Sequence, residues 1–136
     1  ASTAARFATS GINVGLFCYT PGVALSRNVS RKQALEMLLT GDFISAERAA
    51  ELGLINKAVA PGELDAATLE LAQKITDKSP VAVRRGTATF YRQLEADLAT
   101  AYEDASESHA CNMQAEDALE GIDAFIEKRT PTWRGR

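Results

Sequence analysis

Glycine and proline divide this sequence into short segments, which limits the chain to short helices and strands. Ser30, with Gln33 three residues later, predicts a capped helix start, and Gly41 predicts the end of that helix in the left-handed conformation. Ser45 and Gly53 predict the start and the end of a second, shorter helix in the same way. The first part of the chain is therefore expected to hold two short helices separated by turns.

The other segments favour helix over strand. Residues 6–18 are expected to be extended or tightly turned, Pro21-Gly22 to form a turn, and residues 54–59 to form a short strand or an extended link. Apolar spacings of three and four residues predict the helices that follow: one from Pro61-Gly62, two pieces over 81–116, and a last helix over 119–128. The chain is thus predicted to be mostly α with a short β portion near its start.

The composition is that of one globular domain with a core: of 136 residues, 46% are hydrophobic and 24% charged. The longest apolar stretch, residues 12–25, is interrupted by polar residues, glycine and proline, so no membrane span is predicted. Cys18 and Cys111 form neither a disulfide framework nor a metal-binding spacing, which favours a reducing compartment and no metal site. The net charge of −3, without a dominant basic stripe, argues against nucleic acid as a partner.

Residues 1–35 carry basic residues and no acidic one, a composition found both in transit peptides and in interior segments of a domain. The interior interpretation is preferred, because this segment runs directly into apolar structure and no initiator Met precedes it. We therefore expect a cytoplasmic location, with the mitochondrial matrix as the alternative.

No residue stands out as a catalytic group. His109, the single histidine, lies on a predicted helical stripe and is interpreted as a packed or interfacial residue. Glu116, Asp117 and Glu120 could do acid–base chemistry, but acids in the first turn of a helix also stabilise its dipole, and that interpretation is preferred. Two clusters of basic residues could hold phosphate groups or simply face solvent. From the residues alone, the catalytic groups are unknown.

Three stretches resemble the enoyl-CoA hydratase/isomerase (crotonase) superfamily. Residues 34–49, ALEMLLTGDFISAERA, continue to GLIN at 53–56 and resemble the family's A-x-E-x-x-L-T-G-x-x-I-x-A-x-x-A-x-x-x-G-L-V. Residues 120–129, EGIDAFIEKR, with Pro131 and Trp133, are similar to its E-G-x-x-A-F-x-E-K-R-x-P-x-F. Residues 5–16 are similar to its A-x-F-x-x-P-E-x-x-x-G-L. The three motifs follow one another in the family's order along nearly the whole chain.

The resemblance implies a crotonase-like α/β fold, the ββα spiral, of which this chain matches only the C-terminal half. Residues 1–60 would be the end of the spiral core, with a strand, turns, two helices and a short strand. Residues 61–136 would be the C-terminal helical region through which family members form trimers. A family member is about twice this long, and the lack of a starting Met fits a cut product, so the chain by itself is expected to be inactive.

The resemblance also implies chemistry on acyl-CoA thioesters. In the family, two backbone N–H groups of the upstream half hold the thioester oxygen as an enolate develops. Coenzyme A enters as part of the substrate, and no separate cofactor is expected. Gly11 stands where hydratases carry their second catalytic glutamate, at a position that faces the substrate, and glycine can neither give nor take a proton.

Two more residues receive roles from the resemblance. Phe125 and Lys128 match the family's positions near the adenine and the phosphates of a neighbouring subunit's coenzyme A, and a spacing of three would make them neighbours on one helix. The alternatives are core packing for Phe125 and a solvated charge for Lys128.

The resulting hypothesis is a protein that acts on acyl-CoA thioesters by hydration, double-bond isomerisation or another enolate step, in a homotrimer or hexamer. Because Gly11 replaces the glutamate, a reaction other than hydration, or weak hydration, is favoured. The first alternative is a member of the same fold that binds acyl-CoA or assembles without catalysis. The second is an unrelated helical interaction domain.

Overall fold

The computed structural model describes all 136 residues, which form two compact units, residues 1–69 and 70–136. The helix α4 (Leu64–Thr76) carries the chain from one unit into the other, after a short 3-10 turn, η2 (Pro61–Glu63), at the predicted Pro61-Gly62 start. The predicted functional division at residue 60, into spiral core and trimerisation region, stays a prediction.

The β structure of the first unit is confined to a two-stranded antiparallel sheet. Strand β1 (Arg6–Phe7) pairs with β2 (Ile44–Ser45), with Phe7 opposite Ile44. The strand or extended link predicted over residues 54–59 is not a strand; its one ladder contact is an isolated parallel bridge between Ser2 and Val59. The prediction of a mostly helical chain with little β structure is confirmed.

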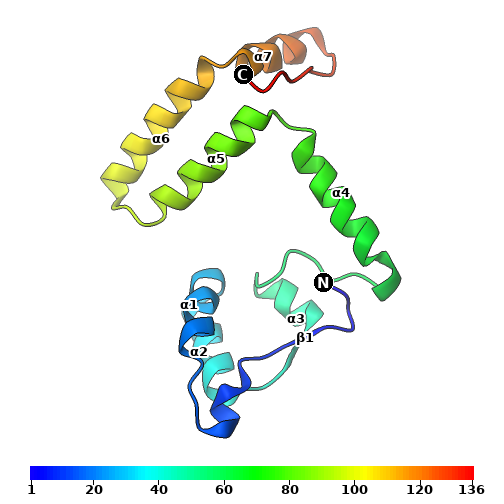
Figure 1. The fold of residues 1–136 in the computed structure, drawn as a ribbon, viewed down its shortest axis with the longest axis vertical. Helices are drawn as coiled ribbons and strands as arrows, with labels where there is room; N and C mark the ends of the chain where they lie inside the picture. The colour runs from blue at the N-terminus through cyan, green and yellow to red at the C-terminus, as the bar shows by residue number, and fades with distance from the viewer. The chain divides into compact units, whose positions relative to one another are not determined.

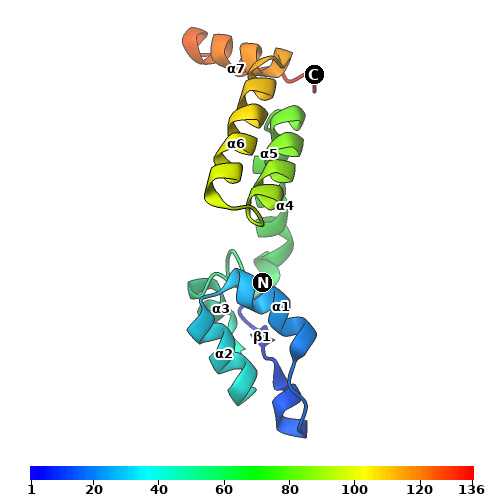
Figure 2. The same cartoon turned by 90° about the vertical axis from the view of Figure 1, so that its left-hand side faces the viewer.

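The first unit contains a helix that the sequence analysis missed. Residues expected to turn at Pro21-Gly22 form α1 (Tyr19–Asn28), which lies beside α2 (Arg31–Thr40) in Figures 1 and 2. Pro21 is tolerated because it occupies the first turn, where a backbone N–H has no helical acceptor. The first helical bond runs from the Gly22 amide to the Cys18 carbonyl oxygen, 2.9 Å away.

The core of the first unit lies between α1 and α2. Its buried members are all apolar: Leu25, Val29, Ala34, Met37 and Leu38. At the end of α2, Gly41 has φ +68°, as predicted, and a Cβ there would lie 2.8 Å from the Ile12 side chain. Both the dihedral angle and the close approach therefore require glycine at the point where the 3-10 turn η1 (Ser10–Val14) meets α2.

The two predicted helix caps of this unit differ in outcome. Ser45 caps α3 (Ala46–Glu51) by accepting a hydrogen bond from the Arg48 amide at 3.1 Å, as predicted. Ser30 does precede α2, but its side chain makes no cap bond, and the Gln33 side chain accepts instead from Arg48. The predicted capping box is therefore wrong, although the helix start is right.

The second unit is entirely helical. As predicted, its middle is divided into two pieces, α5 (Pro80–Gln93) and α6 (Leu98–Met113), which run antiparallel and side by side (Figures 1 and 2). Polar contacts join them: Arg92 Nε donates to Asp104 Oδ2 at 2.8 Å, and the hydroxyls of Thr89 and Ser108 lie 2.8 Å apart. The last helix, α7 (Glu116–Glu127), begins three residues earlier than predicted and ends one residue earlier.

Most large apolar side chains of this unit are exposed. The predicted apolar stripe of α6 faces solvent, with Leu98 and Tyr102 among its exposed members, and His109 is exposed too. Neither α4 nor α6 has a buried residue. None of the helices has the length and apolar character that crossing a lipid bilayer requires.

Candidate functional site

The loop around Gly11 is built so that no side chain fits there. Gly11 lies in η1, and its amide donates to Cys18 Sγ at 3.3 Å. A Cβ on Gly11 would lie 2.7 Å from that sulfur and 2.8 Å from the Leu16 carbonyl oxygen. A glutamate at this position therefore requires the loop to move, since one of the two obstacles is backbone.

Next to this loop the first unit has a hollow of about 540 Å³. The residues Phe7, Ala8 and Thr9, which precede Gly11, form one side, and Leu25 and Met37 of the core form another. Thr9 is fixed there, because its hydroxyl donates to the Met37 carbonyl oxygen at 2.8 Å. Gly11 itself does not line the hollow.

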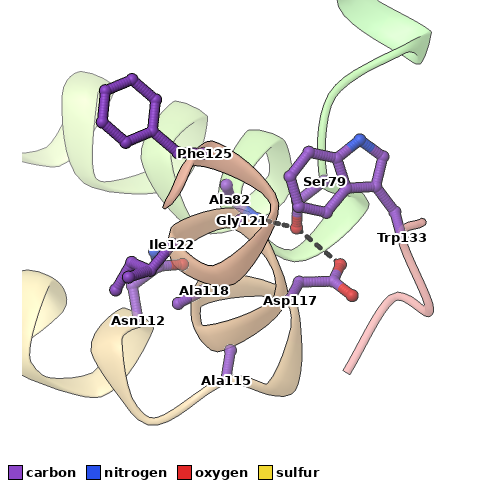
Figure 3. A pocket seen from close by; sticks show the side chains of 10 residues that line it. All are labelled: Ser79, Ala82, Asn112, Ala115, Asp117, Ala118, Gly121, Ile122, Phe125 and Trp133. Carbon is purple, nitrogen blue, oxygen red and sulfur yellow. Dashed lines mark hydrogen bonds between the residues drawn. The ribbon is translucent and has the colours of Figure 1, made fainter. Parts of the chain in front are cut away.

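The second unit has a cavity of about 350 Å³ between α5, the end of α6 and α7 (Figure 3). Small residues such as Ala82 and Ala118 line it together with the larger side chains of Ile122, Phe125 and Trp133. Asn112 Oδ1 is buried at this cavity without a hydrogen-bond partner. Gly121 lies against the Trp133 ring, and a Cβ there would be 3.3 Å from the ring, so any larger residue would push the ring away by a few tenths of an ångström.

Asp117 anchors the C-terminal tail beside this cavity. Its carboxylate, with only 2% of the residue exposed, accepts from Ser79 Oγ at 2.7 Å and from the amides of Arg134 and Gly135 at 2.7 and 3.1 Å (Figure 3 shows the serine bond). The Arg134 amide, followed by the Ser79 hydroxyl, lowers the pKa of this carboxyl below its ordinary value. The predicted role at the helix dipole is thus incomplete, because the carboxylate mainly joins segments 17 to 38 residues apart.

Glu120 anchors the same tail one turn later. Its carboxylate accepts two bonds from the Arg129 guanidinium, at 2.6 and 3.0 Å, and one from the Thr132 amide at 2.7 Å. Hydrogen bonds from Arg129, followed by the Thr132 amide, lower the pKa of Glu120 to about 2. Arg129 also donates to Glu127. Sequence reasoning missed both anchors, since nothing local to Asp117 or Glu120 indicates partners so far along the chain.

Phe125 and Lys128 lie close together in the chain at the end of α7, but not as neighbours on one helix. Phe125 is 85% exposed, so the core-packing alternative is wrong within this chain. Lys128 is outside the helix, in the left-handed conformation with φ 55° and ψ 39°. The helical-neighbour prediction is therefore wrong: α7 ends at Glu127, and the Arg129 amide closes it by bonding to the Ala124 carbonyl oxygen at 3.0 Å. Gly11 belongs to the other unit.

The remaining candidates form no cluster. Nowhere do three or more histidine, cysteine or acidic side chains gather so that they could hold a metal ion. Cys18 is half-buried against the core of the first unit, whereas Cys111 is exposed.

A sequence model of the family described as "Enoyl-CoA hydratase/isomerase" matches residues 1–136. The chain is 53% identical, over 133 residues, to the mouse protein named "Enoyl-CoA hydratase domain-containing protein 3, mitochondrial", covering 98% of this chain and 44% of that protein. It is 36% identical to the short-chain-enoyl-CoA hydratase of Clostridium acetobutylicum, covering 95% of this chain and 50% of that enzyme. The chain thus spans about half the length of the curated relatives it matches.

Solved structures give the same result. The enoyl-CoA hydratase of Mycobacterium smegmatis superposes with a TM-score of 0.94 at 57% identity, covering 97% of this chain and 51% of that one. The human enoyl coenzyme A hydratase domain-containing protein 3 superposes with a TM-score of 0.91 at 52% identity, covering 97% and 52%. The crotonase-like fold expected from the motifs is therefore confirmed, and the chain belongs to the enoyl-CoA hydratase/isomerase family.

Proposed function

We propose that this chain is the C-terminal half of a protein that acts on acyl-CoA thioesters through an enolate held by backbone N–H groups. The match of the family model along residues 1–136 is the observation that carries the proposal. The three motifs and their order support the C-terminal assignment, and the coverage of about half of each relative supports the length. The upstream half supplies the oxyanion-binding N–H groups, and coenzyme A enters with the substrate, without a separate cofactor.

The reaction is one that does not need the second hydratase glutamate. Gly11 has no group that transfers a proton, and the packing of Cys18 Sγ and the Leu16 carbonyl oxygen around it supports a loop built for glycine. Isomerisation or another enolate step therefore fits better than hydration by two glutamates. Gly11 stands where the family's glutamate faces the substrate. We assign its backbone to the lining of the substrate-binding site.

The end of α7 contributes to binding coenzyme A. The ring of Phe125 is free to stack on the adenine because the chain leaves it exposed. Lys128 makes no ion pair within the chain, so its ammonium is available to a phosphate group.

The test compares hydration with α-proton chemistry in the protein as naturally expressed. With crotonyl-CoA, we expect hydration to be about 10²–10⁴-fold slower than that of the Clostridium acetobutylicum hydratase, the usual contribution of a general acid–base group. Exchange of the α-proton of an acyl-CoA for deuterium, or isomerisation of a 3-enoyl-CoA, should be readily measured. Hydration at the rate of the Clostridium enzyme would contradict the proposal.

A Gly11→Glu variant provides the matched test of the loop. We expect it to lose structural stability without gaining hydration, because the new side chain collides with backbone as well as with Cys18. A gain of hydration in this variant would show that the loop can still accept the glutamate.

The second candidate is a non-catalytic member that binds acyl-CoA or assembles, and Gly11 is the observation that favours it. Binding of acyl-CoA without any α-proton exchange would support this alternative.

A homotrimer or hexamer is proposed for the assembled protein. The exposed apolar residues Leu119 and Ile126 of α7 support it, because a partner surface would cover them. The mass of the protein in solution tests this assignment.

Two compartments remain as proposals. The names of the vertebrate relatives include "mitochondrial", which supports the matrix. The Mycobacterium relative is bacterial, which supports the cytoplasm. Fractionation of the source cells distinguishes them.

A further inference from the structure

The turn after α7 contains the only non-glycine residue of the chain with a positive φ. Lys128 has φ 55°, whereas the four other positive-φ positions are glycines. The left-handed conformation is unfavourable for a residue with a Cβ, and helices usually use glycine here. Strained backbone of this kind persists where the surroundings hold it, and it gathers at functional sites. A lysine at a position that favours glycine therefore indicates a role for its side chain.

The residue that fixes this turn is mainly Arg129, which follows Lys128. The Arg129 amide donates a hydrogen bond to the Ala124 carbonyl oxygen. The Arg129 guanidinium donates hydrogen bonds to the carboxylates of both Glu120 and Glu127. Glu120 makes two parallel bonds to it and also fixes the Thr132 amide. Lys128 therefore lies between the end of α7 and a segment that is hydrogen-bonded back to α7.

Three carboxylates of α7 are already paired with arginines. Glu116 pairs with Arg134 and Arg136, and Glu120 and Glu127 pair with Arg129. Lys128 is left as a cation without an ion pair, three residues after the exposed ring of Phe125. In coenzyme A, the 3′-phosphate is on the same ribose as the adenine, so it is the phosphate bonded closest to the base on which the Phe125 ring stacks.

We infer that Glu120 is a positioning residue: through Arg129 it holds Lys128 in the left-handed conformation, in the turn that directly follows the helix of Phe125, with its ammonium free for the 3′-phosphate of coenzyme A. The inference rests on the proposed function, which assigns Phe125 and Lys128 to coenzyme A. Glu120 itself does not touch the ligand. Its carboxylate stays ionised because Arg129 and the Thr132 amide hold its pKa far below neutral pH.

The experiment measures the preference of the naturally expressed protein for coenzyme A over 3′-dephospho-coenzyme A, by calorimetric dissociation constants. We expect a preference of about tenfold or more, as for a charge-assisted contact. Lys128→Gly keeps the left-handed turn and removes the ammonium, and it should abolish the preference. Glu120→Gln should remove most of it while leaving the affinity for the dephospho ligand nearly unchanged. Glu116→Gln, the matched change at another ion-paired carboxylate of α7, should leave the preference intact.

The variants distinguish a failure of the coenzyme A assignment from a failure of the role of Glu120. If Lys128→Gly keeps the preference, the coenzyme A assignment of the proposed function fails, and the inference falls with it. If Lys128→Gly abolishes the preference but Glu120→Gln keeps it, or weakens both ligands equally, only the inference fails. Should Glu120→Gln not fold, Arg129→Lys is the second variant, since it breaks the two parallel bonds, keeps the charge, and should lower the preference as well.

Discussion

The two units of this chain are held together by different interactions. The first unit has a buried apolar cluster between α1 and α2. In the second unit, Val81 and Ala124 are the only buried apolar residues, and the buried polar pair of Ser79 and Asp117 lies beside them. One unit is therefore stabilised mainly by apolar burial, and the other depends on carboxylates that tie its tail to α7.

This difference follows from the partners that each unit has within the chain. Two helices with facing apolar sides can close a small core, whereas α5, α6 and α7 leave most of their large apolar side chains exposed. Hydrogen bonds to ionised groups are stronger than neutral ones, so a few of them, with the Trp133 ring packed on Gly121, can order the tail. The two units should consequently respond differently to core truncation and to acid.

The largest effect is expected from truncation of the first core. Leu38 is 6% exposed and Leu39, its neighbour on α2, is 54% exposed, which makes the two leucines a matched pair. Leu38→Ala should lower the free energy of unfolding by about 2–5 kcal/mol, through lost burial and the cavity left behind. Leu39→Ala should change it by less than about 0.5 kcal/mol. Denaturant titrations followed by circular dichroism measure both, and equal losses would contradict the described core.

Acid should act on the second unit first. The pKa of Glu120 is about 2 in the folded chain, below its usual 4.5, and the pKa of Asp117 is lowered too. A carboxyl whose pKa is lowered by folding stabilises the folded state above its unfolded pKa, and loses that effect as the pH falls through its folded pKa. The tail should therefore hold fully above about pH 4.5 and detach as the pH falls towards about 2.

Trp133 reports this release directly, because it is the only tryptophan and its Nε1 donates to the Asp77 carbonyl oxygen at 2.8 Å. We expect its fluorescence to shift to longer wavelength over this pH range, while amide exchange in α2 stays slow. Glu120→Gln should release the tail already at neutral pH, and Asp123→Asn, on the same helix, should not. A Trp133 signal that is constant down to pH 2 would falsify the role of the carboxylates.

Local signals in the sequence predicted most of the helices but not their packing. Gly41 and Gly53 indicated two helix ends because a left-handed residue after a helix is a requirement of the backbone alone. The same kind of reasoning failed for α1, since Pro21 is a turn signal in most contexts and a permitted first-turn residue in this one.

The candidate site was predicted only in part, and for a physical reason. The motif placed Phe125 and Lys128 near each other, but a helical spacing could not reveal that the helix ends between them. Asp117 and Glu120 were recognised as helix-start acids, while their actual partners come from distant segments that only folding brings near. Long-range hydrogen bonds leave no local pattern to read.

The smallest effects concern serine caps and separate local from long-range roles. Ser45 caps α3 with a bond to its own helix, so Ser45→Ala should cost about 1 kcal/mol of unfolding free energy. Ser30 has the sequence pattern of a cap without the bond, so Ser30→Ala should stay within about 0.5 kcal/mol. Ser79 accepts from the Ala82 amide and also donates to Asp117, so Ser79→Ala should exceed both and should loosen the Trp133 tail. If Ser79→Ala merely equals Ser45→Ala, the buried hydroxyl acts only as a cap, and the tail is held without it.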